Sequence, residues 1–192
     1  MTHGSLTPAV RECDHAIGPA DAPVTLVEYG DYECPYCGMA HPIVQAVRRA
    51  LGDRLRFVFR NFPLAEIHPH AVHAAEAAEA AGAQGKFWEM HDLIFEHQRA
   101  LDDGALARYA EQIGLDAERF ARDLTATSIE RRVRDDFMSG VRSGVNGTPT
   151  FFINGQRWDG PWTDVDAFIA AVAAAEARPG QPVHAGRIDD RD

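Results

Sequence analysis

Two cysteines, in the order Cys34-Pro35-Tyr36-Cys37, form the motif of this sequence that is best suited to chemistry. The motif follows an apolar stretch and opens a helical one, and Pro35 suits a first helical position, where no N–H hydrogen bond is lost. Cysteines three residues apart at a helix start can close a disulfide with little backbone movement. The unpaired N–H groups and partial positive charge of a helix N-terminus favour a thiolate over a thiol. The motif therefore predicts a redox-active pair.

The two cysteines are expected to have different roles. Cys34 comes first, so its sulfur should lie nearest the helix end and the solvent, where a thiolate attacks a disulfide. Cys37 lies one turn deeper and should be more buried, so we expect it to resolve the mixed disulfide. Pro35 and Tyr36, between them, are expected to support this chemistry. The pair itself carries two electrons, so neither an organic cofactor nor a metal is expected.

Metal binding is the alternative interpretation of the motif. A tetrahedral zinc site needs four ligands, and the sequence has no second Cys-x-x-Cys. Cys13 together with His15 or His41 would have to complete such a site. Three further histidines, which are His68, His70 and His73, look like a cluster, but no acidic pattern accompanies them. We expect these to have structural or capping roles, and we expect no metal site.

The apolar patterns predict a strand–helix–strand unit, a helical block and a hairpin followed by a helix. Strands are expected over 24–29 and 55–62, with a helix over 38–51 between them. Helices are expected over 71–81, 87–97, 104–113, 116–124 (with Asp116 as N-cap) and 128–141. Asn154-Gly155 predicts a tight turn between strands 150–153 and 156–159, because both central residues of a type I′ turn need positive φ. A helix over 164–177 closes the series.

This order predicts an α/β domain interrupted by helices. Two strands joined by a helix form a right-handed parallel unit, and the later hairpin adds antiparallel strands. We divide the chain into an N-terminal arm (1–22), a sheet domain in two pieces (23–63 and 144–177) and a helical insertion (64–143). The last residues, 178–192, are rich in Pro, Gly and charge, and they are predicted to be a disordered tail.

Taken together, these features resemble the DsbA-like class of thioredoxin-fold proteins. The resemblance rests on Cys34-Pro35-Tyr36-Cys37, the strand before it, the helical insertion and the run Gly147-Thr148-Pro149-Thr150 leading into strand 150–153. It covers about residues 13 to 177 and implies a thioredoxin fold with an inserted helical subdomain.

The resemblance also implies further site residues. The family residue that matches Pro149 is a cis-proline beside the active disulfide, and the residue before it pairs with an extended peptide. Thr148 and Pro149 are thus expected to form a substrate-docking edge. The family often places a buried acid where Glu28 stands, and a buried carboxylate with a raised pKa can exchange protons near neutral pH. One departure is Tyr36: Pro-Tyr resembles the glutaredoxin pair, and it lacks the histidine of the periplasmic oxidant. A redox potential less extreme than that oxidant's is expected.

Composition limits the partners and the class of protein. Lys and Arg total 19 against 29 Asp and Glu, a net charge of −10, which disfavours nucleic acid as a partner. No apolar stretch approaches the roughly 20 residues of a membrane-spanning helix. Residues 1–12 lack a basic start followed by an apolar run, so we expect a cytoplasmic protein. With 45% hydrophobic residues the chain can build a real core.

The sequence therefore predicts a monomeric thiol–disulfide oxidoreductase. Its expected partners are protein thiols and disulfides, with glutathione or a thioredoxin system as reductant. Two alternatives are a holdase that binds unfolded chains through the helical insertion, and a glutathione-linked transferase or isomerase on the same fold. Relatives of the latter kind often keep Ser or a single Cys where Cys37 stands, so the intact pair counts against it.

Overall fold

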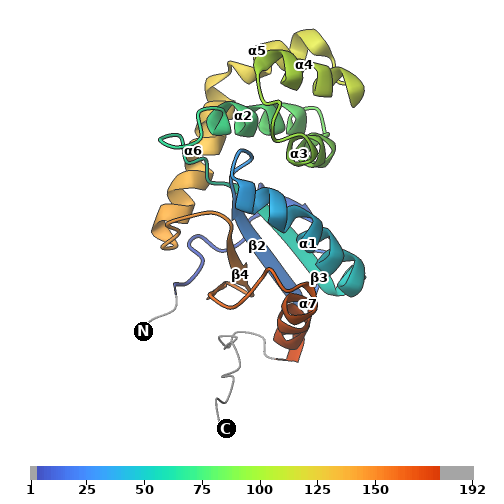
Figure 1. Cartoon of the computed structure of the whole chain (residues 1–192), viewed down its shortest axis with the longest axis vertical. Coiled ribbons are helices and arrows are strands. Elements are labelled where there is room, and N and C mark those ends of the chain that lie inside the picture. The colour runs from blue at the N-terminus through green and yellow to red at the C-terminus, as the bar shows by residue number, and fades with distance from the viewer. Residues whose placement is uncertain (1–3, 178–192) are drawn as a thin grey trace.

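The computed structural model describes residues 4–177 of the chain, and the predicted tail over 178–192 lies outside the described residues. One sheet of five strands runs through the lower half of the molecule in Figure 1, in the order β1-β3-β2-β4-β5. The strands are β1 (His15–Ile17), β2 (Val24–Gly30), β3 (Leu55–Asn61), β4 (Thr150–Ile153) and β5 (Gln156–Trp158). The helices are α1 (Pro35–Leu51), α2 (Ala71–Gly82), α3 (Phe87–Glu96), α4 (Asp103–Gln112), α5 (Ala117–Leu124), α6 (Thr127–Arg142) and α7 (Val165–Ala174).

The central strands pair as the sequence predicts. β2 and β3 are parallel, with Val24 opposite Leu55, and α1 connects them. β4 runs antiparallel to β2, and it returns into β5 through a turn at Asn154-Gly155. Both turn residues have positive φ, 48° and 79°, as a type I′ turn requires. The α/β fold and the antiparallel hairpin are therefore confirmed.

The predicted N-terminal arm, residues 1–22, contains a strand that was not assigned from the sequence. β1 pairs antiparallel with β3, with Ala16 opposite Val58, and so extends the sheet at its edge. Ser5 also bridges to Gln156 at the other side of the sheet. A three-residue strand carries too little periodic pattern to be distinguished from a loop, and its pairing depends on a partner more than 40 residues away.

Smaller differences concern element ends. α1 begins at Pro35, three residues before the predicted start, because Cys34 itself is its N-cap. The predicted last helix ends at Ala174 and continues as a short 3₁₀ turn. Asp116 caps α5 as predicted: its side chain accepts a hydrogen bond from the backbone N–H of Arg119 at 2.8 Å.

Helices cover both faces of the sheet, so the strands are buried on each side. Successive side chains of a strand point to opposite faces. In β2, Leu26 joins the core that contains α1 and α7, whereas Val27 joins the cluster that includes Phe137 of α6. In Figure 1, α2, α3, α4 and α5 form a cap above the sheet, and α6 descends from this cap along one side.

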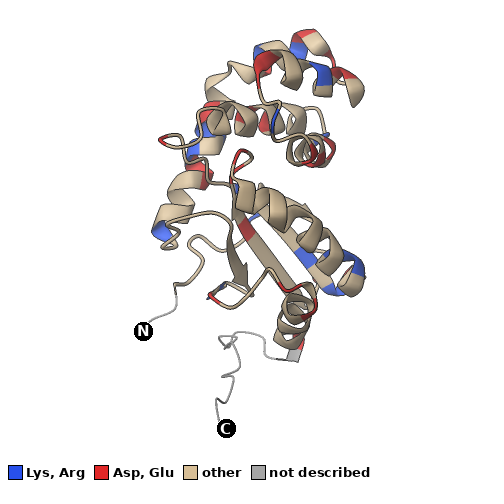
Figure 2. Ribbon diagram, in the orientation of Figure 1, with Lys and Arg blue, Asp and Glu red and all other residues tan. Residues whose placement is uncertain are grey.

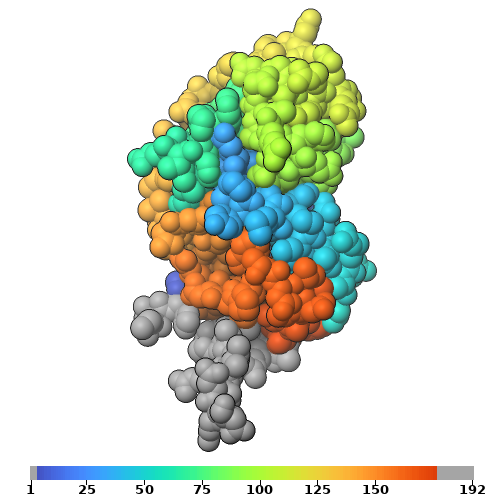
Figure 3. All heavy atoms as spheres, in the orientation of Figure 1, coloured from blue at the N-terminus to red at the C-terminus, as the bar shows by residue number. Residues whose placement is uncertain are grey.

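The helical cap and the sheet share one core. The larger buried cluster runs from the sheet and α1 into α2, α3 and α4 without a break. The insertion is thus packed directly on the first turn of α1. In Figure 3, the blue segment that leads into α1 is bordered by the green surface of the insertion and the orange surface of the C-terminal part.

Charged residues are distributed along the whole described chain, and basic residues gather at the C-terminal end of α1 (Figure 2). Arg48 and Arg49 lie in its last turn, where positive charge is favourable beside the helix C-terminus. Among the described residues, no helix has both the length and the apolar character needed to cross a membrane.

Candidate active site

The cysteine pair lies where β2 passes into α1. Cys34 is the N-cap residue of α1, Pro35 is the first helical residue, and the backbone N–H of Gly38 donates to the Cys34 carbonyl at 3.1 Å. Cys37 is one turn further along the same helix. The spacing and the helix start thus bring the two sulfurs to one place, and both cysteines are in the thiol form here.

The Cys34 sulfur is held in a setting that favours the thiolate. The pKa of Cys34 falls to about 5, chiefly because the Cys37 thiol donates a hydrogen bond to it. Burial acts in the opposite direction, and hydrogen bonds that the thiolate can accept from the Thr148 hydroxyl and from the backbone N–H groups of Cys37 and Tyr36 lower the pKa further. As a thiol, Cys34 donates to the Thr148 carbonyl at 3.4 Å.

One expectation about Cys34 is wrong: the residue does not lie open to solvent. Only 4% of its surface is exposed, against 0% for Cys37. The helix start determines the electrostatic environment of the Cys34 sulfur, but segments that are distant in sequence bury it. Thr148 lies against the sulfur, and Gln98 lies on the Cys34 carbonyl. The neighbouring Tyr36, by contrast, is 61% exposed.

The second cysteine, Cys37, lies in a different setting. It is fully buried, and its sulfur accepts a hydrogen bond from the backbone N–H of Asp31 at 3.4 Å. Burial raises its pKa well above the ordinary value, and the hydrogen bond to Cys34 and the charge of Glu28 add to this rise. The pair is therefore asymmetric, with an easily ionised outer thiol and an inner thiol that keeps its proton.

Glu28 is the buried acid that the resemblance implies. It lies within β2, between Phe59 of β3 and Phe151 of β4, and it shares a sheet face with Leu26, the face that α1 covers. Its Oε1 atom has no hydrogen-bond partner among the described residues. Burial first, and then the charge of Cys34, raise its pKa to about 8. This carboxyl group therefore holds a proton near neutral pH and can exchange it.

This titration predicts a pH dependence of stability that Glu28→Gln removes. Between about pH 5 and 8 the folded state keeps a proton on Glu28 that the unfolded chain has lost. The free energy of unfolding therefore falls as pH rises, by up to about 1.4 kcal/mol per pH unit from this group. Cys34 has the opposite effect, because its lowered pKa adds stability as pH rises. The comparison is thus made between Cys34→Ser and Cys34→Ser/Glu28→Gln, by urea unfolding across this range.

As pH rises from about 5 to 8, the unfolding free energy of the Cys34→Ser/Glu28→Gln protein should increase steadily relative to that of the Cys34→Ser protein. A difference that is constant from about pH 5 to 8 would show that Glu28 titrates normally.

Thr148 and Pro149 lie beside the pair. The peptide bond between them is cis, as the resemblance implies. The Thr148 hydroxyl is buried and has no hydrogen-bond partner among the described residues, so it can turn toward the Cys34 sulfur. Thr148 thus contacts Cys34, Pro149 is its chain neighbour, and Glu28 is near enough for the charge of Cys34 to act on it.

Several residues of the site were not predicted from the sequence. Asp31 accepts hydrogen bonds at its Oδ2 from the Leu64 backbone N–H and contacts His68 Nδ1, both at 2.8 Å. Gln98, beyond the end of α3, donates to the carbonyls of Tyr32 and Cys34. For Asp31, its position directly after β2 was a weak indication of a role in the site. Gln98 has no local pattern of this kind, because its hydrogen-bond partners are more than 60 residues away.

Two of the three histidines of the apparent cluster have separate side-chain partners, and the backbone N–H of His70 donates to Glu33. His68 contacts Asp31, and His73 contacts Asp103 and Glu76. They do not converge on one point, in agreement with the structural roles expected for them.

One other group within residues 4–177 has the spacing of metal ligands. The ligand atoms of His41, His91 and Asp92 all lie within 4.8 Å of one another. The Gln45 amide nitrogen already lies 3.0 Å from His41 Nε2. Burial lowers the pKa of both histidines and the charge of Arg48 lowers it further, while burial raises the pKa of Asp92 and the same charge partly offsets this rise. A cation would meet this positive charge, so the group fits a metal poorly.

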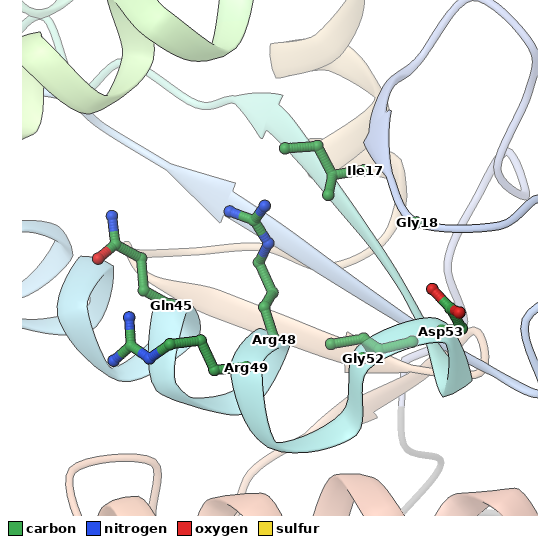
Figure 4. Close-up of a pocket in the computed structure, with 8 residues that line it drawn as sticks. Ile17, Gly18, Gln45, Arg48, Arg49, Gly52 and Asp53 are labelled. Atoms are coloured by element: carbon green, nitrogen blue, oxygen red, sulfur yellow. The ribbon is translucent and has the colours of Figure 1, made fainter.

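A cavity of about 380 Å³ lies at the far end of α1 (Figure 4). Gln45, Arg48 and Arg49 line it from the helix, with Ile17 and Asp53 across from them. Arg48 lies fourteen positions after Cys34 along the helix, which is about 21 Å at 1.5 Å per residue. The cavity is therefore separate from the cysteine pair.

Comparisons with known proteins place the chain in a family. The model of a family described as Thioredoxin matches residues 11–172. A thioredoxin-like oxidoreductase from Silicibacter pomeroyi DSS-3 is similar in structure, with a TM-score of 0.70 and 30% identity, over 78% of this chain and 85% of that one. The chain belongs to the thioredoxin family.

Within this family, the neighbours in structure are of the DsbA kind. BdbD from Bacillus subtilis has a TM-score of 0.78 at 24% identity, and the match covers 91% of this chain and 98% of that one. For α-DsbA1 from Wolbachia pipientis the TM-score is 0.77 at 18% identity, over 88% and 94%. These likenesses show a DsbA-like thioredoxin fold, here carrying a Cys-x-x-Cys pair suited to thiol–disulfide exchange.

The curated relatives are longer proteins. The chain is 47% identical over 187 residues to a protein named Na(+)/H(+) antiporter NhaA 3 from Salinispora tropica, which is 96% of this chain and 28% of that relative. It is 49% identical over 174 residues to an NhaA 1 from Salinispora arenicola, which is 90% and 26%. The chain thus spans about a quarter of the length of these relatives.

Proposed function

We propose that this chain is a protein thiol–disulfide oxidoreductase in which Cys34 attacks and Cys37 resolves. The observation that carries the proposal is the asymmetry of the pair: the pKa of Cys34 is about 5, while that of Cys37 is raised well above its ordinary value. At neutral pH Cys34 is thus a thiolate that can act as a nucleophile, whereas Cys37 keeps its proton.

Reduction of a substrate disulfide takes two displacements. The Cys34 thiolate attacks one substrate sulfur, forms a mixed disulfide, and releases the other substrate sulfur as a thiolate. The mixed disulfide removes the Cys34 charge that helps to raise the pKa of Glu28, so this carboxyl group ionises more readily. Cys37 then gives its proton to the Glu28 carboxylate, and its sulfur attacks the Cys34 sulfur and releases the second substrate thiolate. Two electrons pass from the pair to the substrate, and Cys34 and Cys37 end as a disulfide. Oxidation of a substrate dithiol follows the same steps in reverse.

The substrate is expected to approach past Thr148 and Pro149. The slight exposure of Cys34 means that an incoming sulfur reaches it through a narrow opening. Tyr36 and Met39, in the first turns of α1, have exposed side chains with large apolar surfaces, which suit a polypeptide substrate. The transport named for the curated relatives belongs to proteins of which this chain spans about a quarter, and the proposal concerns that quarter alone.

The direct test is a redox titration of the Cys13→Ser protein in glutathione buffers. Cys13 is exposed and would form mixed disulfides of its own, so its removal leaves only the proposed pair to titrate. We expect one reversible two-electron transition, with loss of two hydrogens by mass, and prompt alkylation of Cys34 in the reduced protein. Failure to form the Cys34–Cys37 disulfide, or native protein that resists alkylation, would contradict the proposal.

The expected midpoint lies between two known limits. A Cys34 pKa of about 5 is intermediate between about 7 for a thioredoxin and about 3.5 for the strong periplasmic oxidant. Their potentials are about −270 and −120 mV, so we expect a value near −200 mV. Tyr36 brings no positive charge to the thiolate, which is the reason for expecting a less extreme value than the oxidant's. A potential at either limit would contradict this expectation.

The cellular location, the monomeric state and the use of glutathione or a thioredoxin system stay predictions. The same holds for the holdase alternative, which would survive replacement of both cysteines by Ser.

A further inference from the structure

The Gln98 side chain joins the helical insertion to the active-site turn. It lies in the connection between α3 and α4, and its amide nitrogen donates to the Tyr32 carbonyl at 2.8 Å and to the Cys34 carbonyl at 2.9 Å. Both amide hydrogens are thus used on the turn that presents Cys34. The Cys34 carbonyl also accepts the first hydrogen bond of α1, from Gly38 at 3.1 Å.

The other side of the same amide rests on Gly38. A Cβ atom added at Gly38 would lie 2.0 Å from Gln98 Oε1, a distance that real side chains do not reach. The glycine therefore leaves the room that the amide occupies, directly after Cys37. Gln98 thus contacts the active-site segment at three points: before Cys34, at Cys34 and after Cys37.

We infer that Gln98 is a positioning residue for the Cys34 thiolate, through which the helical insertion sets the reactivity of the pair. Only one and two residues, respectively, separate Cys34 from Tyr36 and Cys37, whose N–H groups point at its sulfur. Held by the amide, the Cys34 carbonyl faces the insertion while those N–H groups face the thiolate. The inference deepens the proposed function and rests on it.

The electrostatic direction follows from the geometry. The Gln98 N–H groups direct the positive end of their dipole at the active-site turn and compensate the partial negative charge of two carbonyl oxygens. If these donors are removed, the carbonyls lose a partner and the turn is released from the insertion. Both effects disfavour negative charge on Cys34, so the thiolate becomes less stable.

The test is the pH profile of Cys34 alkylation by iodoacetamide in Gln98→Met, with Cys13→Ser as the common background. Met has nearly the shape of Gln but no donor. We expect the Cys34 pKa to rise by about half to one unit, which lowers the rate at acid pH by about three- to tenfold. Cys37 stays silent because it is buried and its pKa is raised.

Gln84 offers a matched control. This residue also belongs to the insertion and also makes two hydrogen bonds to a distant main chain, with its amide donating to the Asp116 carbonyl and accepting from the Asp116 N–H. Gln84→Met should lower stability about as much as Gln98→Met and leave the alkylation profile unchanged. Equal profiles for both variants, or a Gln98→Met profile like that of the parent protein, would overturn the inference.

A double-mutant cycle with Gly38→Ala distinguishes a specific effect of Gln98 on the Cys34 pKa from general damage to the fold. In the presence of Gln98 the new methyl group must displace the amide, so Gly38→Ala should raise the Cys34 pKa. In a Gln98→Ala background the room is empty, and the same change should add no further rise. Equal shifts in both backgrounds would show that Gln98 is not the cause.

Alkylation of Cys34 needs no substrate, so the experiment can contradict the proposed function and the positioning role of Gln98 independently. If the parent protein alkylates with an ordinary cysteine pKa, the proposed function itself fails. If the parent shows the lowered pKa and the Gln98 variants keep it, only the positioning role is lost.

Discussion

Replacing Cys34 by Ser is expected to abolish thiol–disulfide exchange, while replacing Cys37 by Ser should trap the reaction half-way. Without the Cys34 sulfur there is no nucleophile at the helix start, because Cys37 is buried and keeps its proton at neutral pH. With Cys34 alone, attack still occurs, but no second sulfur releases the substrate. The loss in Cys34→Ser should exceed about a thousandfold in insulin reduction, a fall typical of removing the nucleophile itself.

The two variants are distinguished by mass spectrometry after incubation with a disulfide-bonded peptide. Cys37→Ser should accumulate a stable adduct of one peptide on Cys34, which a thiol reductant removes, and Cys34→Ser should form none. Cys13→Ser is the control, since this exposed cysteine lies outside the pair and its loss should leave turnover unchanged. Adducts on Cys37 in the Cys34→Ser protein would reverse the assigned roles.

The sequence was sufficient to predict the elements that position the pair, and the reasons are local. β2 and α1 are strongly patterned, the Asn154-Gly155 turn needs positive φ, and Asp116 caps its helix. Each of these features depends on residues within a few positions of one another. Because Pro35 and the cysteine spacing fix the start of α1, the lowered pKa of Cys34 also follows from nearby residues.

What the sequence could not predict depends on contacts between distant segments. The burial of Cys34 comes from residues around 98 and 148. The segment around 98 has no pattern that points to position 34, and Thr148 was expected beside the pair only through the resemblance to a known family. β1 is too short to be recognised without its partner β3. For Gln98, nothing in the amino-acid type distinguishes it from a solvated turn residue. In each case the missing information is the tertiary arrangement, not the local preference of the chain.

The N-terminal segment holds a second feature of this kind, a buried ion pair between Asp14 and Arg60. Both side chains are fully buried, and two Arg60 nitrogens donate to the two Asp14 oxygens at 3.1 and 2.8 Å. Arg60 also donates to the Pro8 and Ala9 carbonyls and to the Tyr29 hydroxyl. The guanidinium group therefore ties the segment before β1 to the centre of the sheet.

Asp14→Ala is expected to destabilise the protein by about 3–5 kcal/mol, because it leaves the Arg60 charge buried and without its counter-ion. Burial opposes ionisation of Asp14, but the hydrogen bonds and charge of Arg60 outweigh it and lower its pKa. The pair therefore stabilises the fold above the ordinary Asp pKa, near 4, and this contribution is lost as pH falls through the lowered value. In urea unfolding, the difference in unfolding free energy between the parent protein and Asp14→Ala should be large at neutral pH and smaller in acid.

Glu176→Ala is the control, since it breaks the exposed Arg54–Glu176 pair and should change stability by less than about 1 kcal/mol. Losses of equal size in the two variants would mean that Arg60 finds other compensation when Asp14 is absent.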